Sequence, residues 1–301
     1  MIRIAEAGVR STVQDRGRLG HLRSGVPPAG AADPFALAAA NALVGNADDA
    51  AGIEIIGSPF RFTCDDARVV AVAGREVSLA TRSRLPGWGS IFVRAGQTVT
   101  VHAGERTRFA YLAVSGGIAT TPILGSRASY LPAGLGAPLR AGDALPLGDA
   151  DAGPEDAARR VEPTAYDGQV RAMAGPHDDR FERDAIARFF GAAFIIEVAS
   201  DRQGVRLGGV PIAPRAGELQ SCGVVAGAVQ VPRGGAPIVL LADHQTTGGY
   251  PVIATVIAAD LGKVAQRVPG ESLRFYRVAR DEALDALRAE RRALDGARMT
   301  A

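Results

Sequence analysis

The greatest concentration of reactive side chains lies in segment 243–250, directly after an apolar run. A carboxylate, an imidazole, amide and hydroxyl groups and a phenol occur there beside two glycines. An acid or an imidazole can transfer a proton, and backbone N–H groups beside glycine can hold a developing negative charge. The segment predicts a catalytic loop; the alternative is an ordinary hairpin whose polar side chains bond the local backbone. The candidate catalytic residues are Asp243, His244 and Tyr250, and the candidate substrate-binding residues of the segment are Gln245, Thr246, Thr247, Gly248 and Gly249.

Three other polar segments that contain glycine lie in the first half of the chain, at 12–18, 25–34 and 124–130. The second of them leads into an expected helix N-terminus, which favours anions. In the second half, Arg202 or Arg206 could clamp a carboxylate through the planar guanidinium, and surface ion pairs are the alternative. Outside segment 243–250, the candidate substrate-binding residues are Gln14, Asp15, Arg127 and Arg202.

Several standard catalytic arrangements are missing from the sequence. The histidines are far apart, with no H-E-x-x-H pattern and no paired cysteines, so no metal site is expected. Ser115 lacks the first glycine of a nucleophile elbow. His102 falls inside an alternating strand and is interpreted as structural, and Cys222 as a small buried side chain rather than a nucleophile.

Lys263 is the only lysine of the chain. A phosphate-binding loop ends in Gly-Lys-Ser/Thr, whereas Lys263 is followed by Val264. The run around Lys263 also lacks the Met-Lys-Met type of turn on which biotin is carried. We therefore expect this chain alone to carry no cofactor, neither ATP in such a loop nor attached biotin.

Charge and apolar patterning exclude further classes of protein. The formal net charge of +2 is too small for a nucleic-acid binder that relies on a basic field. The uncharged stretch 109–126 is interrupted by glycine, threonine and proline, unlike a membrane helix. The first residues lack the apolar run of a secretory signal, and two cysteines fit a reducing compartment. We expect a soluble, cytoplasmic protein that binds neither nucleic acid nor membrane.

Most of the chain has the pattern of β-strands. Residues 98–102 alternate between apolar and polar side chains, which is typical of a half-buried strand. The 37 glycines and 18 prolines are concentrated between such runs, as a turn-rich barrel or sandwich requires. Further short strands are expected at 68–73, 109–114, 228–231, 238–242 and 273–278. The fold is expected to be mainly β with a few helices.

Three helices are expected. Asp33 and Pro34 make a strong start, because Asp caps free N–H groups and Pro fits the first turn. This helix should end at Gly45 and Asn46. The others are expected at 180–190 and 281–294, the latter with leucines along one side that cover its own domain or, as the alternative, a partner.

A glycine-containing turn recurs twice in each half of the chain. Glycine at the third position suggests a type II turn, in which φ is positive. The turns are 94–97, 140–143, 215–218 and 268–271. They indicate either two related β domains or a turn that β proteins reuse freely.

Composition also suggests where the domains end. Residues 149–163 are rich in Ala, Asp, Arg and Pro without clear periodicity, which is typical of a linker. The expected division is an N-terminal β subdomain at 1–148, the linker at 149–163, a C-terminal β-barrel at 164–280, and a helix and tail at 281–301.

Ordered motifs along most of the chain resemble one family. The chain is similar to the biotin-dependent carboxyltransferase-like group, which includes the C subunit of bacterial 5-oxoprolinase, also called allophanate hydrolase subunit 2, and KipA-like proteins. The motifs that carry the resemblance are 12–15, 25–27 with 33–34, 41–46, 111–117, 125–127, 175–177, 200–204 and 230–251.

The resemblance implies two β subdomains, the second a cyclophilin-like β-barrel. It also implies a KipI-like partner, the B subunit, and a third subunit, with which the chain would open 5-oxoproline to glutamate at the expense of ATP. The expected site is a cleft shared with the KipI-like partner, in which segment 243–250 and Arg127 face a small acidic lactam. Two alternatives stay open: a carboxyltransferase component that acts on urea or a related amide, and a non-catalytic KipA-like regulator that binds a kinase inhibitor.

Overall fold

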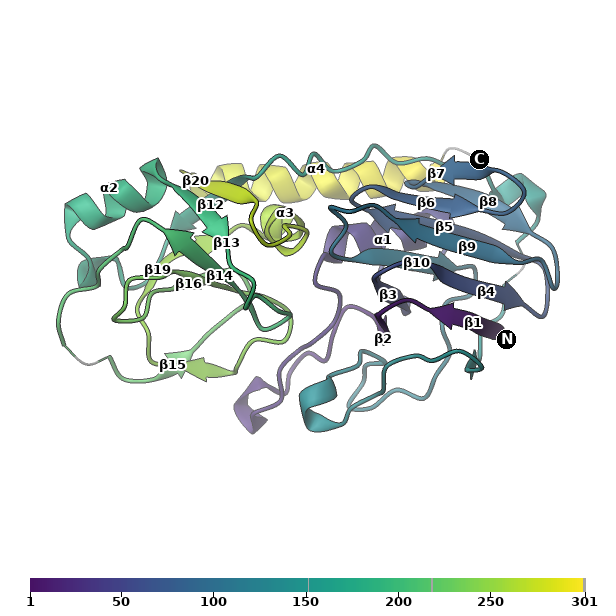
Figure 1. Ribbon diagram of the computed structural model, residues 1–301, viewed down its shortest axis with the longest axis horizontal. Coiled ribbons are helices and arrows are strands. Elements are labelled where there is room, and N and C mark those ends of the chain that lie inside the picture. The colour runs from purple at the N-terminus through teal and green to yellow at the C-terminus, as the bar shows by residue number, and fades with distance from the viewer. Residues whose placement is uncertain (151, 218, 300–301) are drawn as a thin grey trace. The chain divides into compact units, whose positions relative to one another are not determined.

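The computed structural model describes residues 1–150, 152–217 and 219–299, which form two compact units (Figure 1). Unit 1 comprises Met1–Arg18, Ala29–Thr164 and Glu290–Ala301, and unit 2 comprises Leu19–Pro28 and Ala165–Ala289. The division therefore differs from the expected one at three places. Residues 149–163, expected as a linker, belong to unit 1, where Ser90 N donates to Arg159 O and Val161 N donates to Trp88 O. The sequence carries no signal for the assignment of residues 19–28 to unit 2 or of the last residues to unit 1.

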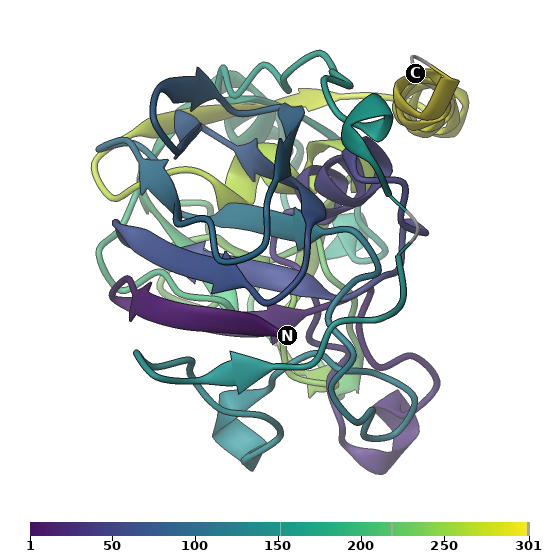
Figure 2. The same ribbon diagram turned by 90° about the vertical axis from the view of Figure 1, so that its right-hand side faces the viewer.

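Unit 1 is built on two antiparallel sheets (Figure 2). One has the strand order β11-β1-β4-β9-β6-β7 and the other the order β2-β3-β10-β5-β8. The strands are β1 (Ile2–Ala7), β2 (Arg10–Gln14), β3 (Gly52–Ile56), β4 (Phe60–Cys64), β5 (Arg68–Gly74), β6 (Val77–Ala80), β7 (Arg84–Pro86), β8 (Gly89–Val93), β9 (Val99–Ala103), β10 (Ala110–Val114) and β11 (Ala144–Leu145). Short 3-10 helices occur at Leu131–Ala133 and Pro154–Asp156.

The core of unit 1 lies between these sheets, because both contribute apolar side chains to one buried cluster. The six-stranded sheet alternates in burial, as in Phe60–Cys64, so its other face meets solvent. Strands β5 and β10 are instead buried along their whole length. The second covering layer is helix α1 (Pro34–Leu43), which contacts both of them.

Helix α1 begins as its sequence predicts. The Asp33 side chain accepts a hydrogen bond from Ala36 N at 3.1 Å, and Pro34 occupies the first turn. Its small, fully buried alanines let it lie close to the sheet. The loop before it is held by a buried carboxylate: Glu54 Oε2 accepts from Ala32 N at 3.0 Å and from the Tyr111 hydroxyl at 2.8 Å.

Unit 2 is a closed seven-stranded β-barrel, which confirms the barrel expected for the second half. Its strand order is β12-β19-β16-β17-β14-β13-β20, and the closing pair β12–β20 is parallel. The barrel strands are β12 (Gln169–Ala174), β13 (Ala193–Ile196), β14 (Gly204–Gly209), β16 (Ala228–Gln230), β17 (Ile238–Leu240), β19 (Val252–Val256) and β20 (Ser272–Arg277), and a separate two-stranded sheet pairs β15 (Cys222–Gly223) with β18 (Thr247–Gly248). The helices are α2 (Arg183–Gly191), α3 (Leu261–Ala265) and the 3-10 turns Leu22–Ser24, Asp178–Arg180 and Ala258–Asp260.

Aromatic packing fixes α2 to the barrel. The ring of Phe189 stacks on Phe275 with centroids 4.5 Å apart, and Phe194 contacts both rings. The helix starts at Arg183 rather than at residue 180, because the three residues from Asp178 form a 3-10 turn. Lys263 on α3 lies 3.4 Å from the Asp167 carboxylate and donates to Gln169 O at 3.1 Å.

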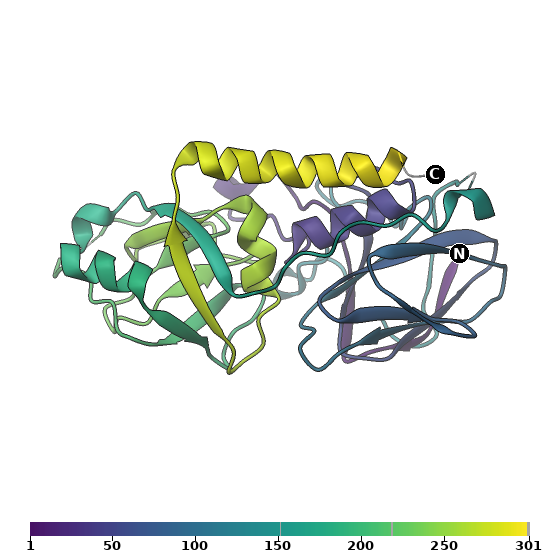
Figure 3. The same ribbon diagram turned by 90° about the horizontal axis from the view of Figure 1, so that it is seen from above.

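The last helix, α4 (Arg280–Met299), follows β20 directly (Figure 3). Its leucines do not all cover a domain as expected, since Leu284 and Leu287 are exposed whereas Leu294 is buried. In unit 1, Arg291 and Arg298 both pair with Asp48. None of the described helices is long and apolar enough to cross a bilayer.

The recurrent turn has the expected geometry. The φ angles of Gly96, Gly142, Gly217 and Gly270 are all positive. In the first, second and fourth turns the fourth residue donates its N–H to the carbonyl of the first, at 3.0 to 3.1 Å. Residue 218, which ends the third turn, lies outside the described residues.

Candidate functional site

Segment 243–250 connects two barrel strands. It follows β17 by two residues, pairs with β15 through its residues Thr247 and Gly248, and leads into β19. Val224 N donates to Thr246 O at 3.2 Å, which ties the segment to the residues after β15. The segment is thus a loop with a short strand of its own, held on the barrel at both ends.

Asp243 and Arg202, both singled out from the sequence, meet each other. Arg202 Nε lies 2.9 Å from Asp243 Oδ2 and Arg202 Nη2 lies 3.0 Å from Oδ1, a two-pronged ion pair. Both side chains are about nine-tenths buried, and Asp243 N donates to Arg202 O at 2.9 Å. The pair anchors the start of the loop to the segment before β14. Proton transfer by Asp243 and clamping of a ligand by Arg202 stay predictions.

His244 is held as a neutral imidazole. Its Nδ1 lies 2.6 Å from Gln245 O, and because a carbonyl only accepts, Nδ1 carries the proton and Nε2 is the acceptor. Burial lowers the pKa of His244, and the hydrogen bond to Gln245 O and the charge of Asp243 oppose this only in part. A neutral imidazole suits a general base, so this role remains a prediction for His244.

The middle of the loop rests on Gln230, a buried residue of β16 that sequence reasoning did not single out. Gln230 Oε1 accepts from Gln245 Nε2 at 3.0 Å, and Gln230 Nε2 lies 3.5 Å from Tyr250 O. Gly248 lies against the same amide: a methyl group there would overlap Gln230 Nε2. In the sequence, the one feature that marks Gln230 is a polar side chain at the end of an apolar strand.

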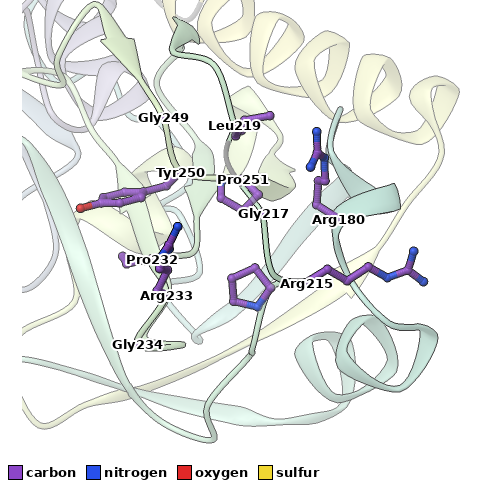
Figure 4. Close-up of a pocket in the computed structure, with 11 residues that line it drawn as sticks. Arg180, Arg215, Gly217, Leu219, Pro232, Arg233, Gly234, Gly249, Tyr250 and Pro251 are labelled. Carbon is purple, nitrogen blue, oxygen red and sulfur yellow. The ribbon is translucent and has the colours of Figure 1, made fainter.

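A cavity of about 500 Å³ lies where the loop ends (Figure 4). Gly249 and Tyr250 of the loop and the following Pro251 form part of its wall, so the end of the loop faces a space large enough for a small molecule. The rest of the described lining is Arg180, Pro214, Arg215, Gly217, Leu219, Pro232, Arg233 and Gly234. Asp243 and His244 are not among these residues.

The arginines of this cavity were not predicted as site residues. Arg180 ends the short 3-10 helix before α2, and Arg233 lies in a Pro-Arg-Gly-Gly turn. Neither position differs in sequence from an ordinary surface arginine. Only the closure of the barrel brings the two segments to one cavity.

Gln14, Asp15 and Arg127 meet in unit 1. Asp15 accepts from Arg127 N at 2.6 Å and from the Ser126 hydroxyl at 2.7 Å. Gln14 Nε2 donates to Ser129 O at 3.1 Å, whereas the buried Gln14 Oε1 has no partner in the described part of the chain. Arg127 Nε donates to Thr120 O at 2.6 Å. These contacts show a loop junction, and substrate binding there stays a prediction.

Two further residues considered in the sequence lie in strands. His102 lies in β9 as expected. Cys222 is half-buried in β15 rather than fully buried, and both cysteines are free thiols. Over residues 1–150, 152–217 and 219–299, no group of three or more His, Cys, Asp or Glu side chains could hold a metal ion.

Comparison with known proteins identifies similar sequences along nearly the whole chain. A family model described as carboxyltransferase domain, subdomains A and B, matches residues 24–277. The chain is 37% identical to the 5-oxoprolinase C subunit of Escherichia coli (strain K12), over 97% of this chain and 96% of that protein.

Solved structures show the same fold. The urea carboxylase of Kluyveromyces lactis superposes with a TM-score of 0.87 and 26% identity, over 98% of this chain and 29% of that one. TTHA0988 superposes with a TM-score of 0.82 and 31% identity over 91% of this chain, and this chain spans 55% of its length.

Proposed function

The chain belongs to the carboxyltransferase domain family, subdomains A and B, and from this premise we propose that it works as the C subunit of a 5-oxoprolinase complex. The observation that carries the proposal is the 37% identity to the 5-oxoprolinase C subunit over 97% of the chain. Identity over that span covers both units rather than one module. The urea carboxylase likeness is lower in identity and covers a small part of that larger protein.

In the proposed reaction the complex opens the ring amide of 5-oxoproline. The C–N bond of the lactam breaks, water supplies hydroxyl to the carbonyl carbon and a proton to the nitrogen, and glutamate leaves. Hydrolysis of ATP to ADP and phosphate drives the step. Lys263 on α3, the only lysine, pairs with Asp167 and donates to Gln169 O, so we assign the phosphate-binding step to the other subunits.

The partners in this proposal are a KipI-like B subunit and a third subunit. This chain contributes the cavity at the end of segment 243–250, called here the Asp243 loop. His244 of the same loop is the candidate general base. The free thiols of Cys64 and Cys222 suit the reducing cytoplasm in which we expect the complex to work.

Reconstitution tests the proposal. The chain is purified with a KipI-like protein and a third subunit encoded beside it, and glutamate release is measured with and without ATP. We expect ATP-dependent release that disappears when this chain is left out. Full release without it would overturn the proposal, as would transfer of carboxyl from a biotin carrier to urea in place of glutamate release.

A matched pair of variants separates an enzymatic role from a regulatory one. Tyr250 lines the cavity and is 49% exposed, and Tyr276 on β20 is 44% exposed outside it. We expect Tyr250→Ala to lower glutamate release while the complex still forms, and Tyr276→Ala to leave release unchanged. Unchanged release in both variants would make the loop a structural hairpin.

A further inference from the structure

The cavity at the end of the Asp243 loop is basic and has no acidic residue among its described lining. Three arginines, Arg180, Arg215 and Arg233, are among the residues that line it. The three differ in what they already bind. Arg215 pairs through Nε and Nη2 with the two carboxylate oxygens of Glu182, at 3.0 and 3.2 Å. Arg180 lies 3.7 Å from the Asp179 carboxylate, a looser contact.

Arg233 makes neither a side-chain hydrogen bond nor an ion pair with any described residue. Figure 4 shows that Arg215 extends away from Arg233 and Tyr250, as its bond to Glu182 requires. The charge left for a ligand is therefore that of Arg233, with Arg180 as the second candidate. A guanidinium binds a carboxylate through two parallel N–H groups.

We propose that this cavity binds the carboxylate of a small cyclic acid, with Arg233 as the residue that recognises the charge. The inference rests on the proposed function, since it makes the lactam acid and its ring-opened product the ligands of this cavity. Similarity to known proteins does not indicate which residue binds the carboxylate or by what chemistry. The remaining wall fits such a ligand: the Tyr250 ring, Pro214, Leu219, Pro232 and Pro251 offer apolar surface to a small ring.

The cavity is formed before any ligand arrives, because backbone hydrogen bonds join the segments of its rim. Val231 N donates to Pro251 O at 2.9 Å, and Ile212 N donates to Gly235 O at 2.8 Å. Arg215 N donates to Arg180 O at 2.8 Å. Gly235 N, which donates to Pro232 O at 2.9 Å, closes the turn that carries Arg233. A fixed rim reduces the ordering cost of binding.

Steady-state kinetics of the reconstituted complex test the assignment. Losing one charge-assisted contact to a carboxylate should raise KM on the order of ten- to a hundredfold. We expect this for Arg233→Gln, with kcat within about twofold of the parent and a smaller rise for Arg233→Lys, which keeps the charge but loses the planar fork. The control is Arg188→Gln on α2, an exposed arginine outside the cavity, which should change neither constant. A KM for Arg233→Gln within about twofold of the parent would overturn the proposal.

A binding measurement on the full chain separates this inference from the proposed function. Isothermal titration compares 5-oxoproline with 2-pyrrolidone, the same ring without its carboxylate. Arg233→Gln should weaken the acid about tenfold or more and leave pyrrolidone unchanged. If the acid alone is weakened in a complex that releases no glutamate, the result would support the carboxylate site and reject the enzymatic role. Equal loss for both ligands, or none for the acid, would reject Arg233 as the carboxylate partner while leaving glutamate release as evidence for the function.

Discussion

Arg202 and Asp243 of unit 2 form a buried ion pair with each other. The Arg202–Asp243 pair is nine-tenths buried and has two-pronged geometry. Removing one member of such a pair leaves the other charge buried without its counter-ion, which costs more than the pair contributes as a whole. The pair therefore matters chiefly for where the loop begins.

A double-mutant cycle tests this anchoring role. We expect Asp243→Leu to lower the free energy of unfolding by about 3 kcal/mol, because buried Arg202 loses its two-pronged contact with this carboxylate. Combining it with Arg202→Met should cost clearly less than the sum of the two single changes, since no orphaned charge remains. Urea unfolding of the full chain measures all three variants. Strict additivity would show that the two groups are not coupled.

His244 should make the stability of the chain depend on pH. Burial lowers the pKa of His244 in the folded chain below its ordinary value of 6.5. Between these two pKa values the unfolded chain binds more protons, so stability is full above the ordinary value and falls as the pH drops. We expect a lower urea midpoint at about pH 5.5 than at about pH 7.5, and a smaller difference in His244→Gln.

The control for this prediction is His21→Gln, which leaves His244 in place. It should keep the pH dependence of the parent chain. If His244→Gln and the parent respond equally to pH, titration of this imidazole does not contribute to stability.

Among the elements, the two-stranded sheet of β15 and β18 determines the path of segment 243–250. Gly248 in β18 lies so close to Gln230 Nε2 that a methyl group there would overlap it, whereas Gly223 in β15 faces open space. We expect Gly248→Ala to destabilise the chain by about 1–3 kcal/mol and to disturb the loop, because buried Gln230 has little room to move. Gly223→Ala should stay within about 0.5 kcal/mol of the parent. Thermal unfolding compares the two, and equal effects would contradict a special role for Gly248.

Local sequence patterns predict helices and strands well where the structure depends on residues that are neighbours in the sequence. The alternation at 98–102 gives a half-buried strand, and Asp33 with Pro34 gives the start of α1. Strands β5 and β10 lack alternation because α1 covers the sheet face that the core does not. An apolar run indicates that such a strand is buried, but it does not show which element covers it.

The site is less predictable because it depends on pairing between distant segments. The sequence points to the Asp243 loop, and the Tyr250 end of that loop does reach a cavity. It does not distinguish Arg233 from other surface arginines, since its neighbours in space come from segments that only the barrel brings together. Nor does it show that Asp243 and Arg202, which are far apart in the sequence, form an ion pair.

At the scale of the whole molecule, the chain passes repeatedly from one unit to the other. Unit 1 contains the first residues and also those from Glu290 onward, and both segments of unit 2, Leu19–Pro28 and Ala165–Ala289, lie between them in the sequence. Leu294 and Ala297 of α4 are buried, and Asp48 pairs with two arginines of the same helix. The end of α4 is therefore a structural part of unit 1.

Truncation after residue 289 should destabilise unit 1. Exposing the surface that Leu294 and Ala297 cover should cost on the order of 2–4 kcal/mol. Trp88, the single tryptophan, is buried in unit 1, so its fluorescence follows that unit during unfolding. The double variant Arg291→Gln/Arg298→Gln should lose less than about 1 kcal/mol per pair, because the pairs are partly exposed. A truncated chain as stable as the parent would contradict this role for α4.

The position of α4 also sets an order of assembly during synthesis. The ribosome releases the chain from its N-terminus, so the sheets of unit 1 emerge before the barrel, yet the helix turns that complete that unit emerge after it. The barrel can close as soon as β20 is available, since its parallel pairing with β12 is the closing contact. The unit that begins first in translation is thus the one that finishes folding last.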